Sequence, residues 1–198
     1  TKFDEHLKNL FGSTRTSELK RQLAHRPPQQ REPLVLNALI EALCENKSNY
    51  VLPFKFYGTE QLRTSHFIIF VTKHPIACKI MKQIMYSNSA KDSDGVATFS
   101  FRDSRNFGEG FEQLSMFDRP LQYLKDDIKK EYGGKTVLVS DICNAVDFDF
   151  SCQFVSKNAK DVLRQLELAG EISVVDGRTQ KYRNGKLTMP DKAIIHFK

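Results

Sequence analysis

The sequence lacks any long uninterrupted apolar run, and no stretch reaches the roughly 18 residues that a membrane-spanning helix needs. We therefore expect no membrane partner. No cleavable signal peptide is visible either. The chain starts at Thr1 rather than at a methionine, which indicates a trimmed fragment of a longer protein.

Paired cysteine spacings are also missing. The four cysteines, Cys44, Cys78, Cys143 and Cys152, are scattered along the chain, and each is close to apolar residues. Zinc sites use cysteine or histidine pairs a few residues apart, so we expect no metal site. Scattered single thiols indicate structural cysteines in a reduced, cytoplasmic protein.

No glycine-rich turn follows a predicted strand. Gly108 and Gly110 form the sequence Gly-Glu-Gly, but no strand precedes them. Dinucleotide and adenosylmethionine pockets open with a strand, a glycine-rich turn and then an acidic residue. We therefore expect neither a cofactor site nor a catalytic residue in this chain. Tryptophan is absent too, but 15 phenylalanines and a hydrophobic fraction of 40% are enough for a folded core.

Among the features that are present, residues 156–170 are the most informative. Ser156 is suited to cap a helix at its start, and Gly170 is suited to end one. Ala159, Val162, Leu163 and Leu166 fall on one helical face, and a basic stripe of Lys157, Lys160 and Arg164 falls on another. The spacing predicts an amphipathic helix with one basic side.

The segments around this helix predict a familiar order of elements. Residues 172–175 and 193–197 alternate like two strands of a hairpin with a basic tip, and Asp176 with Gly177 is a turn signal. Upstream, residues 121–132 predict a helix, residues 136–139 a short strand, and residues 140–146 a second helix. Helix, strand, helix, turn, helix and hairpin is the order of a winged helix-turn-helix, so we expect such a domain over residues 121–198.

Seven basic side chains of this domain and one amide are the candidate nucleic-acid contacts. On the helix they are Lys157, Asn158, Lys160 and Arg164, with Asn158 a candidate partner for adenine. On the hairpin they are Arg178, Lys181, Arg183 and Lys186, which suit backbone phosphates. A solvated surface is the alternative for both groups.

The charge of the chain favours an acidic partner only mildly. The net charge is +6 and the pI is about 9.1. Residues 121–198 carry 13 Lys and Arg against 11 Asp and Glu, a net charge of +2. Acidic residues gather in the first predicted helix, which leaves a protein-interaction adaptor open as an alternative function.

The first half of the chain predicts a different architecture. We expect strands at residues 50–57 and 66–72, a helix at 75–85, and a strand-like segment at 97–101. The strand at 66–72 is almost continuously apolar, which predicts that both of its faces are covered. These elements are typical of the end of a Rossmann-like methyltransferase sheet, so we place an α/β segment at residues 1–105 and a connector at 106–120.

Several short motifs resemble one family. The sequence Tyr-Val-Leu-Pro-Phe-Lys-Phe at residues 50–56, followed by residues 66–74, resembles the end of the methyltransferase-like domain of three-Cys-motif partner proteins. Residues 157–172, Arg183 and residues 189–191 are similar to the winged helix that closes that family. The resemblance implies a bacterial protein of phages or mobile elements, with a radical-SAM-like three-Cys protein as its partner.

The sequence thus predicts an α/β segment followed by a winged helix-turn-helix domain. We expect a non-catalytic chain that binds DNA or docks through its winged helix. One alternative is the tail of an S-adenosylmethionine-dependent methyltransferase whose catalytic half is missing from this chain, and the other is the adaptor.

Overall fold

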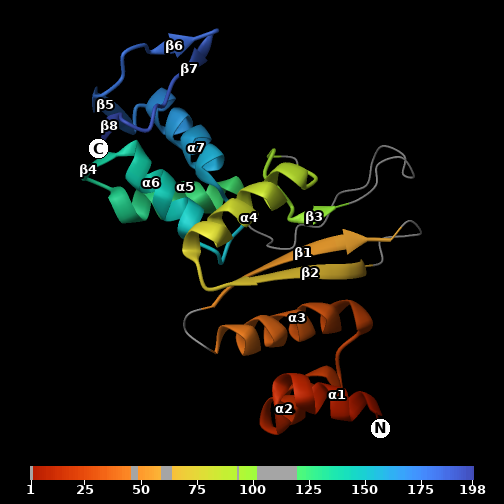
Figure 1. Cartoon of the computed structure of the whole chain (residues 1–198). Helices are drawn as coiled ribbons and strands as arrows, with labels where there is room; N and C mark the ends of the chain where they lie inside the picture. Colours follow the sequence, from red (N-terminus) through yellow and green to blue (C-terminus); the bar gives the residue numbers. More distant parts are fainter. Residues whose placement is uncertain (1, 46–48, 59–63, 93, 102–119) are drawn as a thin grey trace. The chain divides into compact units, whose positions relative to one another are not determined.

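The computed structural model describes residues 2–45, 49–58, 64–92, 94–101 and 120–198, and its architecture is mixed α/β (Figure 1). The chain divides into two units. The first comprises Thr1–Val51 and Val71–His74, and the second comprises Leu52–Phe70 and Pro75–Lys198.

Three helices form the first unit, namely α1 (Lys2–Phe11), α2 (Ser13–Leu23) and α3 (Pro28–Cys44). Gly12 separates α1 from α2 with a φ of 78°, a left-handed conformation that glycine adopts without strain. The side-chain hydroxyl of Thr16 in α2 donates to the backbone oxygen of Leu7 in α1 at 3.0 Å, and Leu19 is buried. The three helices contact one another.

A three-stranded sheet has the order β2-β1-β3. Its strands are β1 (Tyr50–Tyr57), β2 (Thr64–Thr72) and β3 (Ser100–Phe101), and β3 runs parallel to β1. Among the described residues β2 pairs with β1 alone, and the Ile68 side chain on β2 is half exposed. No residue of β2 is buried, and Val71 is exposed as well as Ile68, so the prediction that both faces of this strand are covered is wrong.

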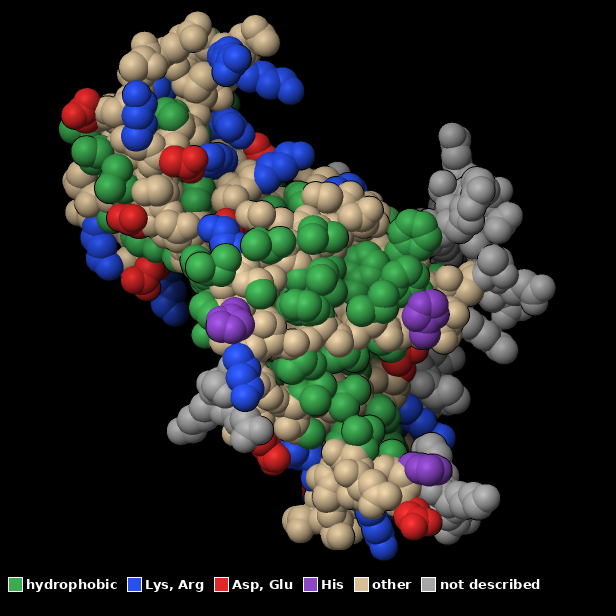
Figure 2. Space-filling model, in the orientation of Figure 1, with side chains coloured by type: hydrophobic (Ala, Val, Ile, Leu, Met, Phe, Trp, Pro, Cys, Tyr) green, Lys and Arg blue, Asp and Glu red, His purple; other side chains and the backbone are tan. Residues whose placement is uncertain are grey.

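The second unit also contains helix α4 (Pro75–Asn88), whose outer side is apolar. Ile76, Ile80 and Ile84 recur every four residues, and each is about half exposed or more. Figure 2 shows hydrophobic side chains gathered near the centre of the view, over α4.

The C-terminal module, residues 121–198, combines three helices with two small sheets. Its helices are α5 (Leu121–Tyr132), α6 (Val139–Phe148) and α7 (Ser156–Leu168). Its strands are β4 (Thr136–Leu138), β5 (Ile172–Asp176), β6 (Tyr182–Arg183), β7 (Lys186–Leu187) and β8 (Ile194–Phe197). The antiparallel order β4-β8-β5 forms one sheet, and β6 with β7 forms a separate hairpin.

The core of this module follows the predicted periodicity. Ala159, Val162, Leu163 and Leu166 of α7 are all completely buried, together with Ile142 of α6 and Ile195 of β8. The predicted pairing of residues 172–175 with 193–197 is confirmed, because Ile172 lies opposite Phe197 and Val174 opposite Ile195. At the end of β5, Gly177 has a φ of 76°, and a Cβ there would lie 1.9 Å from the Lys192 oxygen, so only glycine fits.

Helix α4 belongs with this module rather than with the first unit. It packs on α6, and the side chain of Lys82 is completely buried between them. The Lys82 ammonium donates to the backbone oxygens of Val146 at 3.0 Å and of Asp149 at 2.6 Å, at the C-terminal end of α6. The two units thus divide elsewhere than between residues 1–105 and 121–198. Most of the predicted connector, 106–120, lies outside the described residues.

Candidate nucleic-acid interface

The three residues of the predicted basic stripe on α7 differ in how far other residues hold their side chains. Lys157 is exposed and makes no ion pair with a described residue. Lys160 pairs with Asp191 at 2.9 Å, and its side chain is only 25% exposed. The Arg164 guanidinium is held twice, because its Nε donates to the Leu187 oxygen at 2.9 Å and an Nη donates to Asp161 at 2.5 Å.

Asn158 does not belong to the stripe, which corrects the prediction for this residue. It is 3% exposed, and both ends of its amide are used inside the protein. Its Oδ1 accepts a hydrogen bond from the Val155 backbone at 3.1 Å, and its Nδ2 donates to the Tyr86 hydroxyl at 3.1 Å. Asn158 therefore fixes the start of α7 and joins it to α4, and it cannot reach a base.

The start of α7 also differs from the expected cap. Ser156 is the first helical residue, and Val155 occupies the cap position. The backbone N–H of Ser156 donates to an Asp147 carboxylate oxygen at 2.7 Å, and the other oxygen pairs with Lys79 of α4 at 3.1 Å. Carboxylates are favourable at helix N-termini, where unpaired N–H groups point outward. Residues distant in the sequence thus replace the predicted Ser156 cap.

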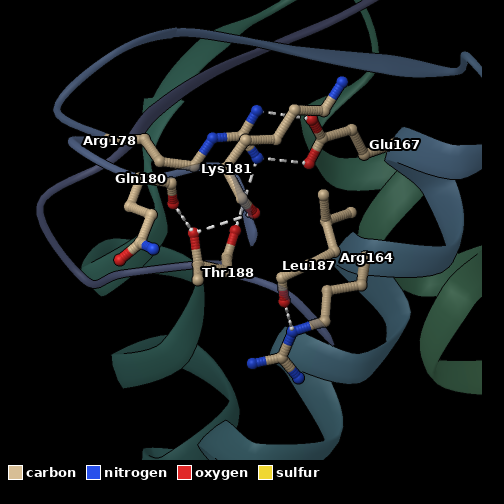
Figure 3. A network of polar contacts seen from close by, with 7 residues as sticks. All are labelled: Arg164, Glu167, Arg178, Gln180, Lys181, Leu187 and Thr188. Atoms are coloured by element: carbon tan, nitrogen blue, oxygen red, sulfur yellow. Dashed lines mark hydrogen bonds and ion pairs between the residues drawn. The ribbon is translucent and has the colours of Figure 1, made fainter. Parts of the chain in front are cut away.

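Arg178 fastens the base of the β6–β7 hairpin to α7 (Figure 3). Its guanidinium donates to both carboxylate oxygens of Glu167 at 2.7 Å, and one nitrogen also donates to the Thr188 oxygen at 3.3 Å. Both side chains of the pair are only 11% exposed. The Glu167 carboxylate raises the pKa of Arg178 above its ordinary value. This bidentate pair makes Arg178 a structural cation, not one available to a ligand.

Thr188 closes the hairpin from the opposite strand. Its backbone N–H donates to the Lys181 oxygen at 2.9 Å, and its hydroxyl donates to the Gln180 oxygen (Figure 3). These bonds join the two sides of the hairpin, and the Arg164–Leu187 and Arg178–Glu167 contacts hold it against α7. The hairpin is therefore a fixed extension of the helix face.

The hairpin tip carries cations that have no counter-charge. Asn184 and Gly185 both have positive φ, 52° and 73°, which is the signature of a two-residue type I′ turn. The register sets Arg183 directly opposite Lys186. Like charges directly opposite each other destabilise a hairpin. Lys181, Arg183 and Lys186 are all exposed, and none pairs with an acid in the described parts of the chain.

A hollow of about 570 Å³ lies between α7 and the hairpin. Its cationic lining consists of Arg164, Arg183 and Lys186. Neutral residues line the rest, and no described residue of the lining is acidic. Figure 2 shows lysine and arginine side chains gathered in the upper part of the view, over the hairpin and α7.

Two further cations near α7 were outside the predicted set. The Lys91 ammonium lies 3.6 Å from the centroid of the Tyr86 ring and donates to the Tyr86 backbone oxygen at 2.6 Å. Burial lowers the pKa of Lys91, and the nearby positive charge of Lys157 lowers it further. Lys192 is exposed beside the Lys160–Asp191 pair. Only the fold brings Lys91 near α7, so sequence spacing gave no signal for it.

The structure thus brings together three of the eight predicted residues in one hollow, namely Arg164, Arg183 and Lys186. Lys181 adjoins them on the hairpin, whereas Lys157 and Lys160 lie near the start of α7. Arg178 is tied to Glu167, and Asn158 is buried.

No cluster of three His, Cys, Asp or Glu side chains that could hold a metal ion occurs in the described part of the chain. Cys78, Cys143 and Cys152 are buried and unpaired with one another, and burial raises the pKa of each thiol to about 11. Such thiols are poor nucleophiles at neutral pH. Among the described helices, none is both long enough and apolar enough to cross a bilayer.

Comparisons of the chain with protein-family models, with curated proteins and with solved structures find no match in any of the three. What the family resemblance implies therefore stays a prediction.

Proposed function

We propose that residues 121–198 form a winged helix that binds duplex DNA through α7 and the β6–β7 hairpin. The element order α5, β4, α6, α7, β5, hairpin, β8 supports this assignment, as does the sheet order β4-β8-β5. In this arrangement α7 is the recognition helix and the β6–β7 hairpin is the wing.

One observation carries the proposal. Arg183 and Lys186 lie opposite each other at the wing tip, and neither pairs with a described acidic residue. An arrangement that costs folding energy and presents charge to solvent is expected where a ligand supplies the opposite charge. DNA is a dense polyanion, and lysine and arginine gain affinity for it by releasing condensed counterions. The acid-free hollow beside the tip supports the same ligand.

The salt dependence of duplex binding tests this function. With about four phosphate contacts, the affinity for a labelled 20-base-pair duplex should fall roughly a hundredfold between 50 and 200 mM salt. Fluorescence anisotropy of the full 198-residue chain measures this directly. If no binding occurs at 50 mM salt, the DNA proposal is wrong, and the adaptor function takes its place.

A second candidate is the tail of an S-adenosylmethionine-dependent methyltransferase. The edge position of β2 favours it, because no described strand pairs with the far side of β2 and further strands would cover such an edge. The coding sequence upstream of Thr1 tests this candidate. A strand followed by a glycine-rich turn in the same reading frame would support it, and a stop codon directly upstream would contradict it.

The setting is part of the proposal as well. The family resemblance supports a bacterial protein with a radical-SAM-like three-Cys protein as its partner, and the scattered free cysteines support a cytoplasmic location. Copurification of that partner with the chain from the native host would test this, and a chain recovered without it would count against the assignment.

A further inference from the structure

We infer that the hollow between α7 and the β6–β7 hairpin seats the sugar–phosphate backbone, so that the chain binds duplex DNA with little regard for base sequence. The inference rests on the proposed DNA binding and names what the interface reads. It departs from the usual role of a recognition helix, which is to contact base edges in the major groove.

The lining of the hollow suits a phosphodiester. Arg164 approaches from α7, and Arg183 and Lys186 approach from the two strands of the hairpin. Thr179, Gln180 and Asn184 add neutral hydrogen-bonding groups, with no acid among the lining residues described. Cations from separate elements around one acid-free hollow match an anionic group that they can contact together.

Arg164 is poorly placed to read a base. Arginine recognises guanine with two N–H groups directed at O6 and N7. In this protein, Nε donates to the Leu187 oxygen (Figure 3). Nη1 donates to Asp161, which leaves Nη2 without a described partner. Two of the five N–H groups are used, and both N–H groups of Nη2 stay available to a phosphate. A bidentate base contact through Nε and Nη2 would break the bond to Leu187, and one through both Nη atoms would compete with Asp161 for Nη1.

The rest of α7 offers little base readout. Asn158 is buried, and the Asp161 carboxylate on the outer side repels DNA unless Arg164 neutralises it. Lys157 is a flexible point charge that suits phosphate. Gln165 is the one exposed amide of α7, and it has no partner in the described chain. Base reading by this helix would therefore depend on Gln165.

Selection from a duplex pool with randomised positions tests the inference on the full chain. We expect no enriched sequence motif, because backbone contacts are the same for every sequence. An enriched motif bound about 100-fold more tightly than the unselected pool would overturn the inference, and loss of that preference in Gln165→Ala would assign the base contact to Gln165. A gap of that size is what one or two bidentate base contacts supply.

Paired substitutions test whether the hollow binds the phosphate backbone. Arg183→Ala with Lys186→Ala should weaken binding of the unselected pool about tenfold or more at 100 mM salt. The matched control, Lys130→Ala with Lys198→Ala, removes the same charge from exposed residues outside the hollow and should change affinity by less than about threefold.

The outcomes distinguish backbone binding in the hollow from DNA binding in general. The R183A/K186A chain should melt no lower than the unaltered chain, since a repulsive pair is removed. Unchanged DNA binding by this folded variant would overturn the inference and leave the function standing. Failure of the unaltered chain to retain any duplex at 50 mM salt would overturn both.

Discussion

Asn158 holds the start of α7 through both ends of its side-chain amide. Its substitution should therefore lower stability and leave DNA affinity nearly unchanged. Replacing it with alanine removes a helix-capping acceptor and leaves the buried Tyr86 hydroxyl without its donor. We expect Asn158→Ala to lower the free energy of unfolding by about 2 kcal/mol, measured by urea denaturation. Duplex affinity, measured well below the unfolding transition, should change by less than about twofold.

Gln165→Ala is the matched control for stability, because Gln165 lies on the same helix but is exposed without a partner. Its effect on stability should stay within about 0.5 kcal/mol. If Asn158→Ala abolished DNA binding without loss of stability, Asn158 would be a base contact after all, and its assignment to the interior would be wrong.

Cys143 predicts a dependence of stability on pH. Burial raises the pKa of its thiol from 9.0 to about 11, so the folded state keeps a proton that the unfolded state loses above about pH 9. The stability that this thiol contributes is therefore complete below pH 9 and is lost as the pH rises through 11. The unaltered chain should exceed Cys143→Ala in free energy of unfolding at pH 8. This difference should be smaller by roughly 1 kcal/mol at pH 10.

Denaturant titrations at the two pH values measure this gap. Val146→Ala is the control, since Val146 is buried on the same helix and does not titrate. The gap for that variant should be the same at both pH values. A Cys143→Ala gap that did not change with pH would show that the thiol is not protected in the folded state.

At the scale of elements, the contact between the β6–β7 hairpin and α7 depends on Glu167 and Arg178. Glu167→Gln keeps the shape of the side chain but leaves the largely buried Arg178 guanidinium without its counter-charge. We expect a loss of about 2 kcal/mol in the free energy of unfolding. Glu131→Gln, which alters an exposed pair with Lys135, should cost less than about 0.5 kcal/mol. Equal effects of the two substitutions would contradict the fastening role of Arg178.

The elements differ in how far the sequence alone could define them. Helix α5 begins and ends at the predicted residues, because its periodicity and the following Gly133 and Gly134 are local signals. The β6–β7 hairpin was not predicted, since strands of two residues carry no measurable alternation. Asn184 with Gly185 is nevertheless a strong turn signal that could have located it.

The site was only partly predictable for the same reason. Asp161 lies three residues before Arg164, so that pair could have been foreseen from helical spacing. Leu187 lies 23 residues after Arg164. Tyr86 is likewise 72 residues from its partner Asn158. Contacts over such separations depend on the fold. They determine which polar and charged side chains remain available to a ligand.

At the scale of the whole molecule, the position of charge matters more than its total. The net charge of +6 is modest for 198 residues, and many cations pair with acids. Lys160, Arg164 and Arg178 are examples, whereas Lys157, Lys181, Arg183 and Lys186 make no ion pair in the described chain. These four cations lie on α7 and the hairpin of one module, and such clustering is expected of a surface that binds a polyanion.

The salt dependence of duplex affinity in the unaltered chain and in R183A/K186A tests this account most directly. Each lost phosphate contact should reduce the slope of log K against log salt by about 0.9, so the two slopes should differ by nearly 2. Lys130→Ala with Lys198→Ala should leave the slope unchanged. Equal slopes for the unaltered chain and R183A/K186A, or no binding by the unaltered chain at 50 mM salt, would contradict the account.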